Sequence, residues 1–270
     1  MIRDISIGRY FPAKSFVHAM DARAKLLLTL AMIVVTFLCK NLYSLAALCA
    51  FTILVYLSSR LKPLLILKSL KPLLPLLILT VIMQVIFTKT GTPVLTVGKF
   101  SVYDDALIMS LFVCVRILVL IVVSSLLTYT TSPTRLTDAI ERLLSPLKHL
   151  KIDVGTFAMM MTIALRFIPT LIDEIDRLTS AQKARGADFE SGNLIQRVKS
   201  LFPIFIPLFV SAIQRASELA DAMICRCYTG EGRTSYRVMK FGWRDAVALL
   251  AVAVFTGGVI TLNVLFAPLL

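Results

Sequence analysis

Apolar runs long enough to cross a lipid bilayer fill most of this chain. The longest, Ala106 to Thr128, contains one charged residue, Arg116, in 23 positions. A transmembrane helix needs about 20 predominantly apolar residues. Over all 270 residues the mean hydropathy is +0.83 and 17% are charged, whereas a soluble domain carries about a quarter charged residues. The sequence therefore predicts an all-α polytopic membrane protein.

Five segments are predicted to span the membrane: residues 24–39, 42–57, 70–87, 106–128 and 246–265. Two other apolar segments, 154–172 and 201–213, are shorter, contain Pro and are flanked by basic residues, so we expect them to be only partly embedded. The fold expected is thus about five transmembrane helices plus three cytoplasmic amphipathic coupling helices, two of them long and crossing.

Basic residues predict the orientation of the chain, because Lys and Arg accumulate in cytoplasmic loops. Five lie in residues 1–25, four in the loop after the second span and sixteen in 129–244, whereas the alternate loops hold Lys40, Lys89 and Lys99. We expect an N-terminal membrane domain (1–128), a cytoplasmic coupling domain (129–243) and a last span (244–270) that ends outside. The net charge of +13 follows from the same rule. It requires no nucleic-acid partner, and no basic patch is interleaved with aromatic residues.

Two features of the membrane domain, a loop outside the membrane and a charged residue within a span, can be interpreted from the residues around them. Residues 94–97 and 100–103 flank Gly98-Lys99 and predict a hairpin outside the membrane, after which Asp104 or Asp105 should cap the fourth span. Arg116 lies inside that span. It is either a functional charge or a side chain that bonds a helix carbonyl, and the sequence leaves both open.

The cytoplasmic segment predicts three helices. The first begins at Ser132-Pro133. The second runs from Met159 to Arg185 with a bend at Pro169, and the third from about Val198 to Cys227. Apolar or small residues recur at helical spacing on the last two, and the small ones permit close packing, so we expect these helices to cross through Leu171, Ile175, Leu178, Ile213, Ala216, Ala220 and Met223.

Both long helices end on a single Arg between small residues. One end is Ala184-Arg185-Gly186, where Gly suits the left-handed position that terminates a helix. The other is Cys225-Arg226-Cys227, a lone C-x-C with no further Cys or His at ligand spacing, so we expect no metal site. A cation at a helix C-terminus is favourable by about 0.3–1 kcal/mol in itself. The repetition, however, suggests that the two ends dock a partner.

Together these segments resemble the transmembrane T component (EcfT/CbiQ-like) of energy-coupling factor ABC transporters. Residues 15–27, SFVHAMDARAKLL, resemble the family opening S-x-x-H-x-x-D-x-R-x-K-L-L. Residues 131–133 and 143–147 match a central stretch, and 164–169, ALRFIP, lead to the Ala-Arg-Gly motif at 184–186. The second such motif falls on residues 225–227, where Cys replaces both flanking residues. That departure leaves open whether this helix ends with the same geometry.

The resemblance implies a non-catalytic coupling subunit in the cell membrane of a prokaryote. Its crossed helices would link two ABC ATPase subunits, which bind ATP and Mg²⁺, to a small substrate-binding membrane subunit. Arg185 and Arg226 would each enter a groove of one ATPase. The substrate would be a vitamin or, in dedicated forms, cobalt or nickel. The absence of a His- or Cys-rich tract favours a vitamin.

An intramembrane lipid-modifying enzyme is the alternative. Such an enzyme needs clustered carboxylates or His near the interface. The chain has only His18 and His149, and the acidic cluster Asp173, Glu174 and Asp176 spreads over about two-thirds of a helix circumference. The glycine-rich residues 230–234 lack the Gly-Lys-Ser/Thr ending of a phosphate-binding loop. We therefore expect ATP to be hydrolysed by partner subunits.

Overall fold

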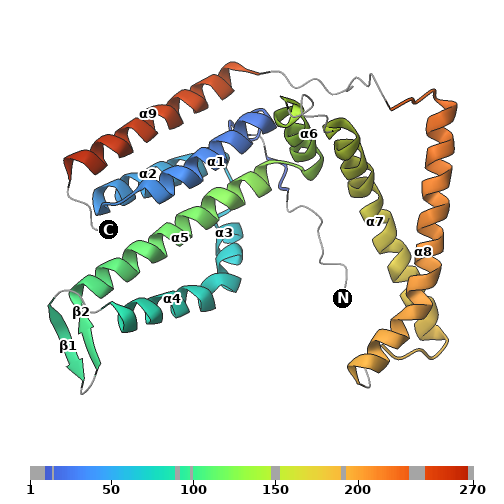
Figure 1. Cartoon of the computed structure of the whole chain (residues 1–270), viewed down its shortest axis with the longest axis horizontal. Helices are drawn as coiled ribbons and strands as arrows, with labels where there is room; N and C mark the ends of the chain where they lie inside the picture. Colours follow the sequence, from blue (N-terminus) through green and yellow to red (C-terminus); the bar gives the residue numbers. More distant parts are fainter. Residues whose placement is uncertain are drawn as a thin grey trace. The chain divides into compact units, whose positions relative to one another are not determined.

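The computed structural model describes residues 10–13, 15–88, 92–97, 100–146, 153–189, 193–230 and 241–266 (Figure 1). It divides the chain into two compact units. The ring unit consists of residues 8–139 and 239–270, and the paired-helix unit mainly of residues 140–238. The three domains expected from the sequence, with boundaries at 128/129 and 243/244, stay a prediction, as does the cytoplasmic assignment of 129–243.

Four helices form a ring in the first unit: α1 (Ala22–Leu38), α2 (Leu42–Ser59), α5 (Asp104–Thr130) and α9 (Trp243–Leu265). Both α1 and α2 contact α5 and α9, so each helix has a neighbour on either side. An apolar core fills the half of the ring in which α1 and α9 end. Its buried members include Val35, Leu48, Phe112, Val119 and Val259.

The third predicted span, 70–87, is longer and less regular than expected. It is built from α3 (Pro63–Leu70), a 3₁₀ turn η1 (Lys71–Leu73) and α4 (Leu74–Phe87). Pro72 and Pro75 lie at these junctions. The backbone nitrogen of proline carries no hydrogen, so each proline interrupts the helical hydrogen bonds. Ser69 Oγ and Tyr129 Oη, 2.6 Å apart, tie α3 to α5.

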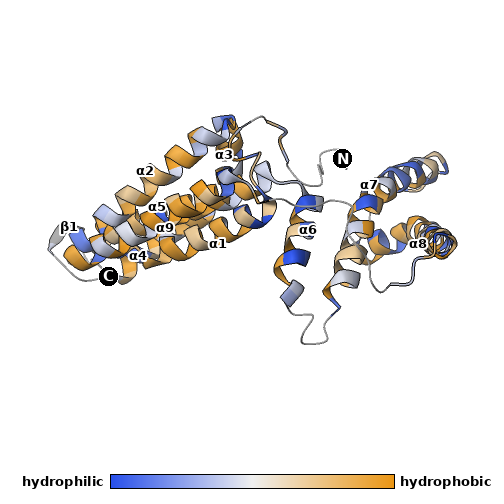
Figure 2. Cartoon of the chain, turned by 90° about the horizontal axis from the view of Figure 1, so that it is seen from above, coloured by the Kyte–Doolittle hydropathy of each residue, from blue (hydrophilic) through white to orange (hydrophobic). Residues whose placement is uncertain are grey.

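Within the described residues, six helical segments are long and apolar enough to cross a membrane: 42–59, 63–87, 104–130, 154–184, 195–225 and 243–265. Four of them contain predicted spans. The remaining predicted span, 24–39, corresponds to α1, which has only 17 residues. The apolar segments 154–172 and 201–213, expected to be only partly embedded, lie inside 154–184 and 195–225, which are by length and composition able to cross a membrane. In Figure 2, apolar residues dominate α1, α5 and α9. In α6 (Pro133–Leu143), hydrophobic and hydrophilic residues alternate.

The predicted hairpin is confirmed in its backbone. β1 (Pro93–Val97) pairs antiparallel with β2 (Phe100–Tyr103), and Val97 lies opposite Phe100. The predicted cap of the following helix was wrong. Tyr103 is the N-cap of α5, and Asp104 and Asp105 lie in its first turn. Carboxylates are favourable there because the N-terminal end of a helix carries partial positive charge.

Arg116, in the middle of α5, bonds a carbonyl. Its Nη2 donates to the carbonyl oxygen of Cys39 at 2.7 Å, and its guanidinium lies 4.7 Å from the ring centroid of Phe112. Cys39 follows the last residue of α1, so this carbonyl has no helical N–H to accept from. Arg116 thus holds the end of α1 against α5. Of the two roles that the sequence left open, it has that of a side chain that bonds a helix carbonyl.

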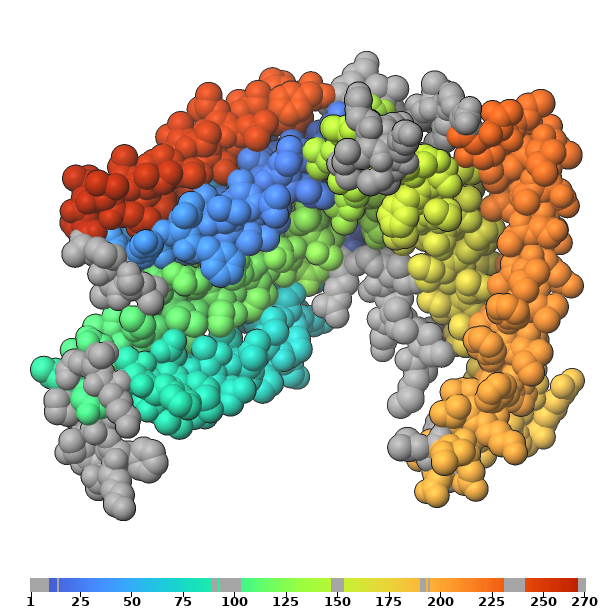
Figure 3. Space-filling view, viewed as in Figure 1, coloured from blue at the N-terminus to red at the C-terminus, as the bar shows by residue number. Residues whose placement is uncertain are grey.

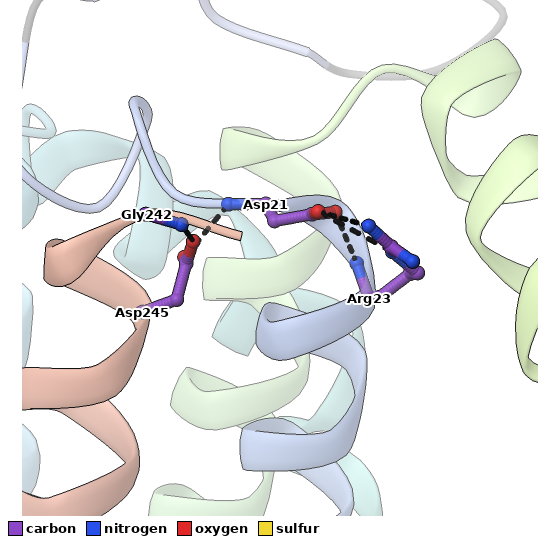
Figure 4. A network of polar contacts seen from close by, with 4 residues as sticks. All are labelled: Asp21, Arg23, Gly242 and Asp245. Carbon is purple, nitrogen blue, oxygen red and sulfur yellow. Dashed lines mark hydrogen bonds and ion pairs between the residues drawn. The ribbon is translucent and has the colours of Figure 1, made fainter. Parts of the chain in front are cut away.

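A polar network ties the start of α1 to the start of α9 (Figure 4). The Asp245 carboxylate is 2% exposed and accepts from the backbone N–H of Asp21 and of Gly242, both at 2.8 Å. The Asp21 carboxylate in turn caps α1 by accepting from Arg23 N at 3.1 Å, and pairs with the Arg23 guanidinium at 2.8 Å. This explains why the opening motif places Asp two residues before Arg.

His18 of the same motif also has a structural role. Its Nε2 lies 2.9 Å from the Phe11 carbonyl oxygen, which can only accept, so Nε2 carries the proton and Nδ1 accepts from Ser15 Oγ at 2.7 Å. Burial lowers the pKa of the imidazole, and so favours this neutral form. The contacts pin the segment before α1 and leave neither ring nitrogen free for catalysis.

Candidate functional site

The first candidate site is the end of α7 (Val154–Ala184). Gly186 has φ +86°, in the left-handed region, as its sequence position predicted. The Ala187 N–H donates to the Gln182 carbonyl and the Gly186 N–H to the Lys183 carbonyl, both at 3.0 Å. These two bonds form a Schellman motif, which satisfies carbonyls that the helix leaves unpaired. Arg185 is the C-cap, the last residue before the chain reverses.

The end of α8 (Leu194–Cys225) repeats this arrangement residue for residue. The Tyr228 N–H donates to the Met223 carbonyl at 3.0 Å, and the Cys227 N–H to the Ile224 carbonyl at 2.9 Å. Arg226 is the C-cap. The two motifs found in the sequence are therefore the same structural device, with Arg in the same position of each.

The exchange of Gly for Cys does not change this geometry. Cys227 has φ +58° and occupies the position that Gly186 occupies in the other helix. The C-cap arginines also agree closely, with φ −85° and ψ 6° at Arg185 and φ −93° and ψ 16° at Arg226. A side chain at a left-handed position costs about 1–2 kcal/mol. The second end thus keeps the shape of the first at some cost in stability.

We expect Cys227→Gly to stabilise the last turn of α8 by up to about 1 kcal/mol, because Gly adopts a positive φ without steric penalty. Gly186→Ala should destabilise the last turn of α7 by about 1 kcal/mol. A Cβ at Gly186 meets no atom within 4 Å, so this cost is conformational alone. Hydrogen exchange of the amides of Ala187 and Tyr228 reports each turn separately. Unchanged exchange in both variants would contradict the assigned geometry.

Both C-cap arginines are exposed, and neither pairs with an acidic residue of the described chain. The flanking Ala184, Gly186 and Cys225 are also exposed and small. Arg presents a planar fork of N–H donors that matches a carboxylate in two parallel hydrogen bonds. Each helix end can therefore offer one cationic fork to a carboxylate of another molecule.

The two helices that carry these ends pack on each other antiparallel (Figures 1 and 3). Arg215 Nη2 of α8 lies 2.6 Å from Glu174 Oε2 of α7, an ion pair that is only partly exposed. Glu174 belongs to the acidic cluster considered for catalysis, and this pairing gives it a structural role. Because the helices run in opposite directions, Arg185 and Arg226 lie at opposite ends of the pair.

A pocket of about 330 Å³ lies between α7 and α8, and the residues that line it show where the two helices face each other. Of the predicted crossing residues, four line it: Leu171, Ala216, Ala220 and Met223. Ile175 and Leu178 are half-buried and lie outside this lining, and Ile213 is 55% exposed. The prediction missed Ile163, Phe167, Ala212 and Arg215. All of these except Arg215 recur at helical spacing with the predicted crossing residues, so the same pattern would have identified them. Arg215 could have been identified only from its charge, which is opposite to that of Glu174.

The sequence did not predict an empty space beside Ala216 and Ala220. The small side chains of Ala216 and Ala220 border the pocket, so they leave a hollow there. The first half of α8 is also open: Phe202, Phe205 and Phe209 are each more than half exposed. The paired helices thus present an apolar surface as well as two cationic ends.

The sequence and these features agree with known proteins. The CbiQ family model, described as cobalt transport protein, matches residues 13–236. The energy-coupling factor transporter transmembrane protein EcfT of Ruminiclostridium cellulolyticum is 45% identical over 98% of this chain and all of its own length. The EcfT of Brevibacillus brevis is 48% identical over 92% of this chain and 94% of its own, and that of Bacillus subtilis 41% identical over 94% and 96%. The chain therefore belongs to the CbiQ/EcfT family, the transmembrane components of energy-coupling factor transporters.

Proposed function

We propose that this chain couples two ABC ATPase subunits to a small substrate-binding membrane subunit, and that it is not itself an enzyme. The observation that carries the proposal is the pair of matching helix ends, each with an exposed Arg that no described acidic residue pairs. One end would dock into each ATPase, where ATP and Mg²⁺ are bound.

The packing of the paired helices supports a mechanical role. The Arg215–Glu174 ion pair and the shared apolar lining join α7 and α8 into one body. A displacement imposed on either end by an ATPase therefore moves both helices. The exposed phenylalanines of α8 and the pocket beside Ala216 and Ala220 offer an apolar surface that could transmit this movement to the substrate-binding subunit.

We propose a vitamin rather than cobalt or nickel as the transported substrate. Among the described residues, no three His, Cys, Asp or Glu side chains are placed to hold a metal ion. Selectivity would then reside in the small membrane subunit. Uptake of labelled vitamins and of labelled cobalt by cells that carry or lack this chain separates the two substrate classes.

Affinity purification of the tagged chain from membranes tests the assembly. The proposal predicts two ATPase chains and one small membrane protein for each copy. Recovery of the chain alone, together with turnover of a lipid substrate, would instead favour the intramembrane lipid-modifying enzyme.

The basic residues support a cytoplasmic N-terminus, cytoplasmic paired helices and a C-terminus outside the cell membrane. In a cysteine-free background, we expect Lys183→Cys, at an exposed position of α7, to react with an impermeant thiol reagent only after the cells are opened. Lys99→Cys, in a segment outside the described residues, should react in intact cells. Labelling of position 183 in intact cells would reverse the orientation.

A further inference from the structure

The half of the ring unit in which α1 and α9 begin is hollow. A pocket of about 230 Å³ lies among α1, α2, α5 and α9, in contrast to the filled core of the other half. Phe51, which stacks on Phe255 at a centroid distance of 4.3 Å, and Met32 line the pocket next to that core. Apolar cavities of about 150 Å³ already bind ligands of the size of benzene. The volume is thus sufficient for a segment of hydrocarbon chain.

The pocket opens sideways, between α2 and α9. Its lining residues on these two helices include Leu54 and Ser58 of α2 and Val247 and Ala251 of α9, all of which are exposed. Both helices are candidate membrane spans. In the membrane this opening faces lipid, so its occupant comes from the bilayer and not from water.

The hydroxyl groups in the lining do not call for a polar ligand. Thr29, Thr52, Ser58 and Thr130 each donate to the backbone carbonyl four residues earlier in their own helix. With their hydrogen bonds made internally, these side chains present mainly methyl and methylene groups to the pocket. The wall is therefore suited to an acyl chain.

One buried cation lies in this lining. Lys25 is 5% exposed, and its Nζ donates to the Thr130 carbonyl at 3.0 Å and, more weakly, to the His18 carbonyl at 3.5 Å. No carboxylate of the described chain lies within ion-pair distance of it, and Asp245 and Asp21 attract it only from farther away. A buried charge is costly unless an opposite charge is near, and an ammonium group has three donors, of which carbonyls use two.

We propose that this pocket binds one acyl chain of a membrane lipid that carries an anionic head, with the head near Lys25. The apolar wall and lateral opening accommodate the chain, and the unpaired Lys25 selects the negative charge. By the predicted orientation, this half of the ring lies in the cytoplasmic leaflet. The proposal is independent of the docking role of the arginines.

Native mass spectrometry of the chain, purified in its assembly and incubated with dioleoyl phosphatidylglycerol, dioleoyl phosphatidylcholine or oleate, tests the proposal. We expect one retained anionic lipid, with phosphatidylglycerol or oleate bound in preference to phosphatidylcholine. Ala251→Phe fills the pocket and should lower retention about tenfold, as an overpacked site does. Ala253→Phe is the matched control, because Ala253 lies on the same helix and outside the lining.

Lys25→Met keeps most of the length of the side chain and removes its charge, so it should abolish the preference for an anionic head. If this variant does not fold, the comparison of Ala251→Phe with Ala253→Phe still decides the question. Retention of phosphatidylglycerol identifies a phospholipid as the source, and retention of oleate alone a free fatty acid. Equal retention by the two Ala variants, no bound lipid in the wild type, or a photocrosslinker at position 251 that captures a partner protein in place of lipid would overturn the proposal.

Discussion

The double variant Arg185→Glu, Arg226→Glu should release both ATPase subunits while the chain still inserts into the membrane and keeps its substrate-binding subunit. Each change replaces a cationic fork by a carboxylate that repels an acidic groove. Truncating one partner of a buried charge pair costs about 2–5 kcal/mol, and reversal adds repulsion. Both arginines lie beyond the last helical residue, so neither α7 nor α8 depends on them for packing.

The amount of ATPase recovered with the tagged chain from detergent extracts measures this effect. Either single variant should retain one contact and lower recovery less, because two sites on one body reinforce each other. Arg185→Lys should be weaker than wild type, since Lys keeps the charge and loses the fork. Arg177→Glu is the matched control, an exposed charge reversal on α7 two turns before its end. Full recovery of ATPase by the double variant would place docking elsewhere.

Asp245→Ala should strongly destabilise the ring unit. It removes the acceptor of the N–H groups of Asp21 and Gly242. A hydrogen bond to a charged group contributes about 1.5–3 kcal/mol, and this change removes two. The change also unties the start of α1 from the start of α9, two segments that lie more than 200 residues apart in the sequence.

A fall in the thermal unfolding midpoint of the purified chain checks this expectation. Asp245→Asn keeps one carbonyl oxygen and should fall between Ala and wild type. Asp105→Ala, an exposed carboxylate in the first turn of α5, is the control for loss of charge. A midpoint for Asp245→Ala equal to that of Asp105→Ala would contradict the role given to the network in Figure 4.

Local patterns carried the successful sequence predictions. The left-handed turn at Gly186 and the hairpin around residues 94–103 depend on short stretches of chain, and both are in the structure. The membrane class followed from the lengths of apolar runs. The cap of α5 was misassigned by one or two residues, because Tyr103 supplies an extended N-cap that no side-chain preference indicates.

The features that depend on distant residues could not be read from the sequence. Nothing local indicates that Asp245 meets Asp21, that Arg116 reaches the end of α1, or that a pocket interrupts the ring. Each depends on which faces of four helices meet. The conformation of Cys227 was also unpredictable, since Cys has no preference for a positive φ and takes it because the Schellman bonds require it.

A photocrosslinking amino acid placed at position 185 or at position 226 tests most directly that the two matched helix ends hold the ATPases. In membranes that contain the whole transporter, each position should capture an ATPase subunit, and Arg177, replaced in the same way, should not. A chain that carries the crosslinker at both positions should capture two ATPases. Capture of no ATPase from either end, by a chain that still transports substrate, would contradict the proposed coupling mechanism.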